Sequence, residues 1–169
     1  MTGLPTDRTD AAADTAQAMR TVLRNVPTSI AVVAGLDTTG RPVGLAVGTF
    51  TSVSLEPPLV AFCPGSESMS WPRIRPTGRF CINVLGIGQD AVCTAFAAKG
   101  ENKFEGLDWQ PSVNGAPRIP GSVAHLDCDL EVEHVAGDHT VVIGRVTAIE
   151  AGGSATPLVF LKGRLIGVR

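Results

Sequence analysis

The chain has 169 residues, of which 44% are hydrophobic and 18% are charged, and its net charge is −2. This size and composition predict one folded domain with a substantial core. The basic residues are scattered, which excludes the dense positive patch that nucleic acid or an anionic membrane surface requires, and no apolar run is long enough to span a membrane.

The chain begins with a polar segment. We expect residues 1–14 to form a flexible tail and residues 15–169 to form the domain. Apolar residues recur at helical spacing from Asp10 to Asn25, and Pro27 ends this predicted helix. The first ten residues contain no apolar core, so the sequence predicts no secretory signal and a cytoplasmic location.

Apolar runs bounded by turn residues predict the strands. In chain order they are Ser29–Leu36, Val43–Phe50, Leu59–Phe62, Arg79–Leu85, Leu126–Glu133, Thr140–Ile149 and Leu158–Leu161. Turn residues at 37–40 and 136–138 predict hairpins between the strands that flank them. Residues 100–121 are rich in glycine and proline and predict a loop.

Helical segments are fewer. Ser66–Pro76 contains two prolines and predicts a helical turn or two. A longer helix is predicted over Asp90–Ala98, and its inward face would carry Val92, Ala95 and Phe96.

The order of these elements predicts the fold class. Strands outnumber helices, and consecutive strands are joined by hairpins, which favours a mainly β fold: a closed or nearly closed antiparallel barrel with flanking helices. Apolar and acidic residues alternate in Leu126–Glu133. This predicts one buried face and one wet face, and His125, Asp127 and Asp129 share the wet one.

The strand predicted at Val43–Phe50 has one face with almost no side chains. Gly44, Ala46 and Gly48 alternate with larger residues, so this face is nearly bare backbone. A planar ligand can lie flat on such a face, and a closely packed second sheet requires the same pattern. Hydroxyl groups follow at residues 49–54, as a ligand with a polyol tail would need.

Gly86 and Gly88 lie between a predicted strand and a predicted helix, in the order of a dinucleotide-binding fingerprint. That fingerprint also requires a second parallel strand after the helix, and residues 99–106 have no strand character. We therefore favour turn glycines over a Rossmann fold.

Each of the three histidines could be a metal ligand or a catalytic group. His125 shares its predicted face with Asp127 and Asp129, but no pair of residues has metal-ligand spacing, so a solvated face is favoured and no metal is predicted. His134 is interpreted as a polar residue near a strand end. His139 follows a turn, where it can donate a hydrogen bond to a substrate or simply form part of the hairpin.

The four cysteines have no paired spacing, so we expect reduced thiols rather than a disulfide or a metal motif. The sequence contains no nucleophile elbow, and it contains no tyrosine. The lack of an obvious acid, base or nucleophile indicates that a bound cofactor supplies the chemistry.

Taken together, several separated segments resemble the flavin reductase family, whose members have the FMN-binding split-barrel fold of Greek-key type. The matching segments are Val26–Ile30, Pro42–Leu59, Phe62–Pro64, Ser70–Trp71, Gly78–Leu85, Asn102–Phe104 and Gly137–Thr140. The resemblance extends over residues 18–168.

The resemblance implies which residues bind the cofactors. The isoalloxazine ring and ribityl chain would be lined by Pro42, Val43, Gly44, Leu45, Ala46, Gly48 and Thr49. The rest of the flavin, including its phosphate, would be held by Cys63, Pro64, Gly65, Met69, Ser70, Ala95 and Phe96. The nicotinamide cofactor would meet Gly137, Asp138 and His139, with His139 as the catalytic residue that orients the nicotinamide.

The chain departs from the family at two positions. Close relatives often carry arginine where this sequence has Met69 and Ala95, and a cation there can neutralise the phosphate. Two alternatives follow. Either Arg73, Lys99 or Lys103 supplies the charge, or the flavin binds weakly and acts as a diffusible substrate.

The family's activity would make this chain an NAD(P)H:flavin oxidoreductase. It would be a homodimer that transfers a hydride from NADH or NADPH to FMN or FAD and supplies reduced flavin to a partner monooxygenase. Three alternatives stay open: a flavin-binding electron carrier or sensor without turnover, an FMN-dependent oxidase, and a structural dimer without a cofactor.

Overall fold

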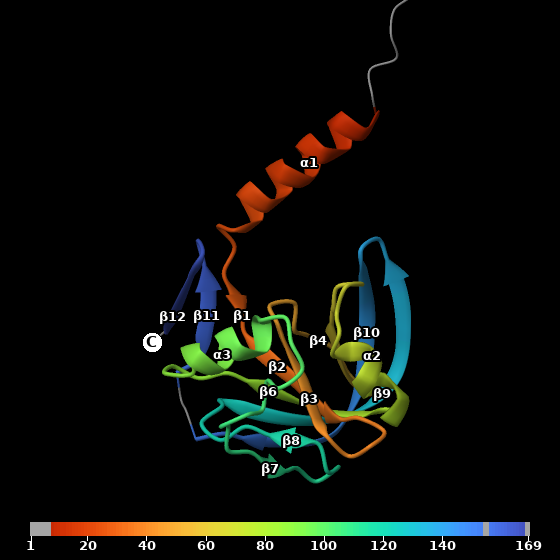
Figure 1. Ribbon diagram of the computed structural model, residues 1–169, viewed down its shortest axis with the longest axis vertical. Coiled ribbons are helices and arrows are strands. Elements are labelled where there is room, and N and C mark those ends of the chain that lie inside the picture. The colour runs from red at the N-terminus through yellow and green to blue at the C-terminus, as the bar shows by residue number, and fades with distance from the viewer. Residues whose placement is uncertain (1–7, 154–155, 168–169) are drawn as a thin grey trace, which may run out of the picture.

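The computed structural model describes residues 8–153 and 156–167 (Figure 1). The helices are α1 (Arg8–Leu23), α2 (Trp71–Ile74), the 3-10 helix η1 (Arg75–Thr77) and α3 (Asp90–Ala97). The strands are β1 (Thr28–Ser29), β2 (Ala31–Leu36), β3 (Pro42–Val47), β4 (Thr51–Leu55), β5 (Pro58–Phe62), β6 (Arg79–Val84), β7 (Gln110–Pro111), β8 (Pro117–Arg118), β9 (Ala124–Ala136), β10 (His139–Ala151), β11 (Leu158–Leu161) and β12 (Arg164–Gly167).

One sheet dominates the fold. Its strand order is β3-β2-β6-β9-β10-β5-β4, and all of its pairings are antiparallel. The predicted mainly β, antiparallel fold is therefore confirmed, and the Rossmann alternative is excluded because it needs parallel strands. The strands β3 and β4 are the two edges of this sheet. Gly88 has a φ of 87° in the segment before α3, as expected of a turn glycine.

Both predicted hairpins are present. In the first, β2 pairs with β3 from Ala31↔Val47 to Leu36↔Pro42. In the second, the long strands β9 and β10 meet at Ala136↔His139, and Gly137 in the turn has a φ of 64°. Figure 1 shows this second hairpin rising beside the rest of the sheet and ending in its turn.

The core has two parts. One is a cluster in which the rings of Phe62, Trp71 and Phe80 meet edge to face, with centroids 5.1–5.7 Å apart. The other is a cluster that contains Phe96 of α3 and Leu158 of β11. Alternate residues of β2 pack into one cluster and then the other, so this strand is buried on both faces.

The N-terminal helix begins and ends two residues earlier than the predicted Asp10–Asn25. It begins at Arg8, so residues 8–14 of the predicted tail are helical, whereas residues 1–7 lie outside the described part of the chain. Its apolar residues face solvent, and Met19 is 61% exposed. Figure 1 shows α1 projecting away from the sheet above β11 and the β9–β10 hairpin. None of the described helices is long and apolar enough to cross a membrane.

The prediction that one face of β9 is exposed to solvent is wrong for the first half of the strand. His125 and Asp127 are only 6% and 5% exposed, whereas Asp129 is exposed as predicted. The segment 110–123 covers them: Val113 N–H donates to Asp127, and Asn83 Oδ1 accepts hydrogen bonds from Ile119 N–H and His125. No group of residues in the described chain could hold a metal ion.

Two further predictions need correction. Ala95 of α3 is exposed, and Cys93 takes the predicted inward position beside Phe96. The predicted 100–121 loop contains the short pair β7–β8, and β12 completes a three-stranded sheet with β1 and β11. Both additions consist of very short strands, which hydrophobic patterning detects poorly.

Candidate functional site

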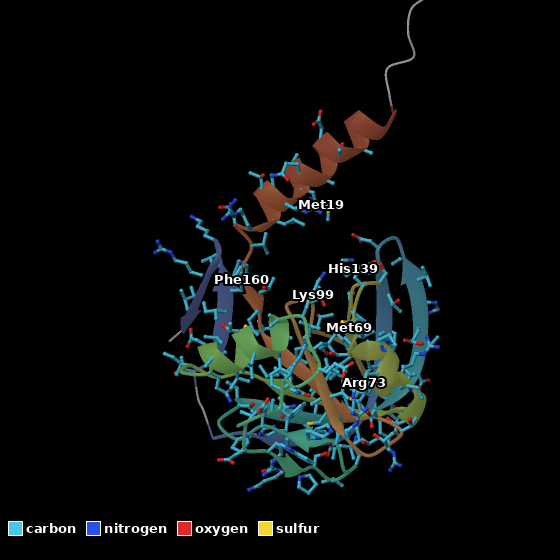
Figure 2. All side chains as sticks on the ribbon, viewed as in Figure 1. Met19, Met69, Arg73, Lys99, His139 and Phe160 are labelled. Atoms are coloured by element: carbon cyan, nitrogen blue, oxygen red, sulfur yellow. The ribbon has the colours of Figure 1, made fainter. Side chains whose placement is uncertain are left out.

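A cavity of about 370 Å³ lies between β3, the segment after β5, the end of α3 and the turn of the β9–β10 hairpin. Its volume lies within the range of small-molecule sites, about 300–1,000 Å³. The residues that line it are Leu45–Thr49, Cys63–Gly65, Glu67–Ser70, Phe96–Gly100, Lys103 and His139. Figure 2 shows Lys99, Met69 and His139 gathered in this region of the fold.

The strand β3 contributes mainly backbone to the cavity. The side chains of Leu45 and Val47 are buried in the core, while Ala46 and Gly48 carry little or no side chain. Because β3 is an edge strand, alternate N–H and C=O groups along it have no partner strand. These groups can bind the hydrogen-bonding edge of a flat ligand.

The bare face of this strand has different neighbours along its length. At Gly44 the face is filled by packing, because a Cβ there would lie 2.5 Å from Cε1 of Phe96. At Ala46 and Gly48 it lines the cavity. At Gly44 the small residue is thus explained by packing against a helix rather than against a second sheet, and at Ala46 and Gly48 the ligand surface stays a prediction.

Three predicted flavin-site residues lie outside this cavity at the start of β3. They are Pro42, Val43 and Gly44. Pro42 lines a neighbouring cavity of about 320 Å³ together with Arg73 and Phe104. Val43 is buried in the core.

Hydrogen bonds join the walls of the site. Cys63 N–H donates to Thr49 Oγ1 over 2.8 Å, which ties the segment after β3 to the segment after β5. The second segment is tied to the hairpin turn, because Thr140 N–H donates to the Pro64 carbonyl over 3.0 Å and Ser66 N–H donates to the Asp138 carbonyl over 2.8 Å. These bonds bring residue 139 into the cavity from a strand more than seventy positions away in sequence.

His139 is the member of the predicted Gly137-Asp138-His139 group that lines the cavity. Its Nδ1 lies 2.7 Å from Asp138 Oδ1, and its Nε2 lies on the side of Gly65. The hydrogen bond from His139 is the main reason that the pKa of the Asp138 carboxyl is lowered. Gly137 and Asp138 form the turn that presents the imidazole.

Two lysines bring positive charge into the cavity. Lys103 Nζ donates to the Phe96 carbonyl over 2.9 Å, near the C-terminus of α3, and burial lowers the pKa of this lysine. Lys99 lies at the same wall. Neither lysine forms an ion pair with a carboxylate of residues 8–153 or 156–167, although Glu67 also lines the cavity.

Arg73, the third candidate cation, does not line this cavity. Its Nη2 lies 2.8 Å from Asp37 Oδ2, and this hydrogen bond is the main reason that the pKa of Asp37 is well below its usual range. The ion pair joins α2 to the turn between β2 and β3. Arg73 is thus committed to a partner, whereas the two lysines are available to an anion.

Of the remaining predicted flavin-site residues, some line the cavity and one does not. Met69, Ser70 and Phe96 line the cavity, but Ala95 faces away from it. The sequence prediction missed Glu67 and Ser68, and it missed Ala97, Ala98 and Gly100 around Lys99, which was named only as a candidate cation. A signal for Gly100 was present, since it comes shortly after the predicted helix and next to Lys99.

The chemistry of the cavity fits a flavin. Bare edge-strand backbone is available to a flat ring with donor and acceptor atoms, and the hydroxyls of Thr49, Ser68 and Ser70 are available to a polyol chain. The two ammonium groups of Lys99 and Lys103 are available to a phosphate. The donors present thus match the three chemical parts of FMN.

Comparison with known proteins agrees with this fit. A family model described as flavin reductase like domain matches residues 23–169. A flavin reductase of Pseudomonas putida is 48% identical over 87% of this chain and 86% of its own length. The reductase subunit HsaB of a flavin-dependent monooxygenase from Rhodococcus jostii is 43% identical over 88% of this chain and 76% of its own length.

Solved structures show the same similarity. Nitrilotriacetate monooxygenase component B of Mycobacterium thermoresistibile superposes with a TM-score of 0.87 at 39% identity, over 94% of this chain and 89% of that one. The NADH:FAD oxidoreductase SgcE6 of Streptomyces globisporus, solved with NAD and FAD fragments, superposes with a TM-score of 0.82 at 31% identity, over 99% of this chain and 98% of that one.

Proposed function

Because the chain belongs to the family of flavin reductase-like domains, we propose that it is an NAD(P)H:flavin oxidoreductase that reduces FMN or FAD. The observation that carries the proposal is the composition of the cavity. It combines the exposed backbone of β3, the imidazole of His139 and two lysines that pair with no carboxylate in the described part of the chain.

We assign the ring end of the flavin to Leu45, Ala46, Gly48 and Thr49, and its phosphate to Lys99 and Lys103. This revises the phosphate site inferred from family resemblance, in which Ala95 took part. An exposed alanine can contribute no charge, whereas an ammonium group can.

Bound flavin supplies a ring that accepts a hydride from reduced nicotinamide. The contribution of the chain is to hold two flat rings in contact, and this step requires no acid or base from the protein. His139 would orient the nicotinamide, from a turn that backbone hydrogen bonds hold against the cavity wall. The absence of an evident acid or base in the sequence is consistent with this division of labour.

A partner monooxygenase and a homodimer are also part of the proposal. HsaB is named as a reductase subunit of a flavin-dependent monooxygenase, and that similarity supports a monooxygenase as the recipient of reduced flavin. The exposed apolar side chains of Met19, Leu23 and Val26 on and after α1 support a second copy of the chain, because a solitary helix of 16 residues is marginally stable in water. The predicted domain boundaries and the cytoplasmic location stay predictions.

The test is binding followed by turnover. Titration of FMN fluorescence should give saturable binding, and NADH should be oxidised only when flavin and protein are both present. Tight flavin retention without NADH oxidation would favour a carrier or sensor, and bleaching of the flavin by a substrate other than NAD(P)H would favour an oxidase. Light scattering with size exclusion would measure the mass in solution, and a monomer would refute the dimer.

A further inference from the structure

Asp138 lies beside the proposed nicotinamide site without lining the cavity. Its side chain is 86% exposed, and its Oδ1 lies 2.7 Å from Nδ1 of His139, which is 48% exposed. An exposed ion pair of this kind contributes little to folding. The contact between Asp138 and His139 is therefore poorly explained by a contribution to folding stability.

The backbone around the pair is fixed. Ser66 N–H donates to the Asp138 carbonyl and Thr140 N–H donates to the Pro64 carbonyl, so both flanks of the turn are held to the cavity wall. Gly65 and His139 also form an isolated antiparallel bridge. With the backbone fixed, the orientation and hydrogen-bonding state of the imidazole are set by its side-chain contacts.

The charges around the imidazole are of both signs. Asp138 accepts from His139 and is also within reach of the charge of Arg20 on α1, and both interactions lower the pKa of Asp138. Glu67, Lys99 and Lys103 line the same cavity as His139. Asp138 thus remains an ionised carboxylate, which can only accept hydrogen bonds.

We propose that Asp138 is a positioning residue that holds the neutral His139 imidazole in its Nδ1–H tautomer, so that Nε2 is an acceptor beside Gly65. A neutral imidazole has one donor and one acceptor nitrogen, and a carboxylate at Nδ1 fixes which is which. The ligand group that Nε2 takes is then a hydrogen-bond donor. This inference rests on the proposed function, in which that donor is the carboxamide N–H of the nicotinamide.

The test compares Asp138→Ala with Asp138→Asn. Alanine removes the acceptor, whereas the amide oxygen of asparagine retains it. We expect Asp138→Ala to raise the KM for NADH about fivefold, corresponding to about 1 kcal/mol for one hydrogen bond, with kcat and FMN affinity unchanged. Asp138→Asn should stay within twofold of the parent, as should Asp129→Ala, which removes an exposed carboxylate from β9, the strand that precedes this turn.

A second readout does not depend on turnover. Nitrogen-15 NMR of the imidazoles at pH about 8.5, where histidine is ordinarily neutral, reports the tautomer directly, and His139→Ala identifies the signal. We expect the Nδ1–H form in the parent and in Asp138→Asn, and a shift toward the Nε2–H form in Asp138→Ala. An unchanged tautomer in Asp138→Ala would overturn the inference, and so would an equal increase in the KM for NADH in Asp138→Ala and Asp138→Asn. A lack of NADH oxidation by the parent would instead overturn the proposed function. It would leave the tautomer assignment intact, because the NMR measurement does not depend on turnover.

Discussion

The ring of Phe96 lies directly against the backbone of Gly44, where a Cβ would approach Cε1 to 2.5 Å. This contact joins the edge strand β3 to the end of α3. The carbonyl of Phe96 in turn accepts the hydrogen bond from Lys103. The strand assigned to the flavin ring and the lysine assigned to its phosphate therefore both contact Phe96, the strand through the ring and the lysine through the backbone carbonyl.

Substitution of Gly44 should disturb both parts. We expect Gly44→Ala to lower the free energy of unfolding by about 1–3 kcal/mol, because the added methyl group overpacks the core at the Phe96 ring. FMN affinity should fall as well, because displacing Phe96 displaces the wall that carries Lys103. Urea unfolding and FMN titration measure the two effects.

A matched glycine provides the control. Gly153 has no heavy atom within 4 Å of a Cβ built on it, so Gly153→Ala should change stability by less than about 0.5 kcal/mol. Unchanged stability and unchanged FMN affinity in Gly44→Ala would show that the Phe96 ring lies too far from Gly44 to exclude a methyl group.

Lys103 can be tested with two flavins. Lys103→Gln should weaken FMN binding about tenfold, corresponding to about 1.4 kcal/mol for a lost contact to a charged group. Riboflavin has no phosphate, so its affinity should change by less than twofold. Fluorescence titration with both flavins gives the comparison, and Lys162→Gln on the exposed β11–β12 turn is the control. Equal losses for both flavins would place the phosphate elsewhere.

The cysteines provide a chemical map of the site. Cys63 lines the cavity, whereas Cys81, Cys93 and Cys128 are buried. Burial, followed by the charge of Asp127, raises the pKa of Cys128 to about 12, and burial likewise raises the pKa of Cys81 and Cys93.

N-ethylmaleimide should therefore modify the native protein at Cys63 alone, and saturating FMN should slow that reaction. Peptide mass spectrometry identifies the labelled thiol. Full labelling of Cys63 at an unchanged rate in the presence of FMN would place the flavin outside this cavity.

Stability should depend on pH through His125. Burial, followed by the charge of Arg118, lowers the pKa of His125, so the folded state resists a proton that the unfolded state accepts. The contribution is complete above the ordinary histidine pKa of about 6.5 and is lost as the pH falls below it. Asp37 also has a lowered pKa, but its contribution is lost only at a much lower pH, below the usual aspartate range.

Chemical unfolding between about pH 7 and pH 5 tests this dependence. The parent should lose stability across that range, and His125→Gln should lose less, although it starts from a lower value because the bond to Asn83 is altered. An identical slope in the two proteins would assign the pH dependence to other groups.

The sequence predicted the elements well because their signals are local. An apolar run predicted β2, alternation predicted β3, turn residues predicted both hairpins, and Pro27 marked the end of the first helical segment. The same local signals cannot say which other segment covers a face. His125 was expected in solvent because its strand alternates, but a segment that starts near residue 110 folds over it. Helical spacing likewise predicted α1 without saying what covers its apolar residues, and no described part of the chain covers them.

The site shows the same limit. Small residues at 44, 46 and 48 indicated a bare face, but only the position of α3 shows that Phe96 occupies its first part. The resemblance identified His139, whereas the choice among Arg73, Lys99 and Lys103 depended on tertiary structure. Asp37, on the turn after β2, holds Arg73 away from the cavity, and spacing along the sequence gives no sign of that ion pair.

If this cavity brings NAD(P)H and flavin together for hydride transfer, the reaction is followed by the loss of nicotinamide absorbance. Each pairing of NADH or NADPH with FMN or FAD should be measured with the parent protein and with His139→Ala. We expect oxidation that requires both protein and flavin, with an increased KM for the nicotinamide and nearly unchanged FMN affinity in His139→Ala. Absence of flavin-dependent oxidation with every pairing would refute the proposed reaction.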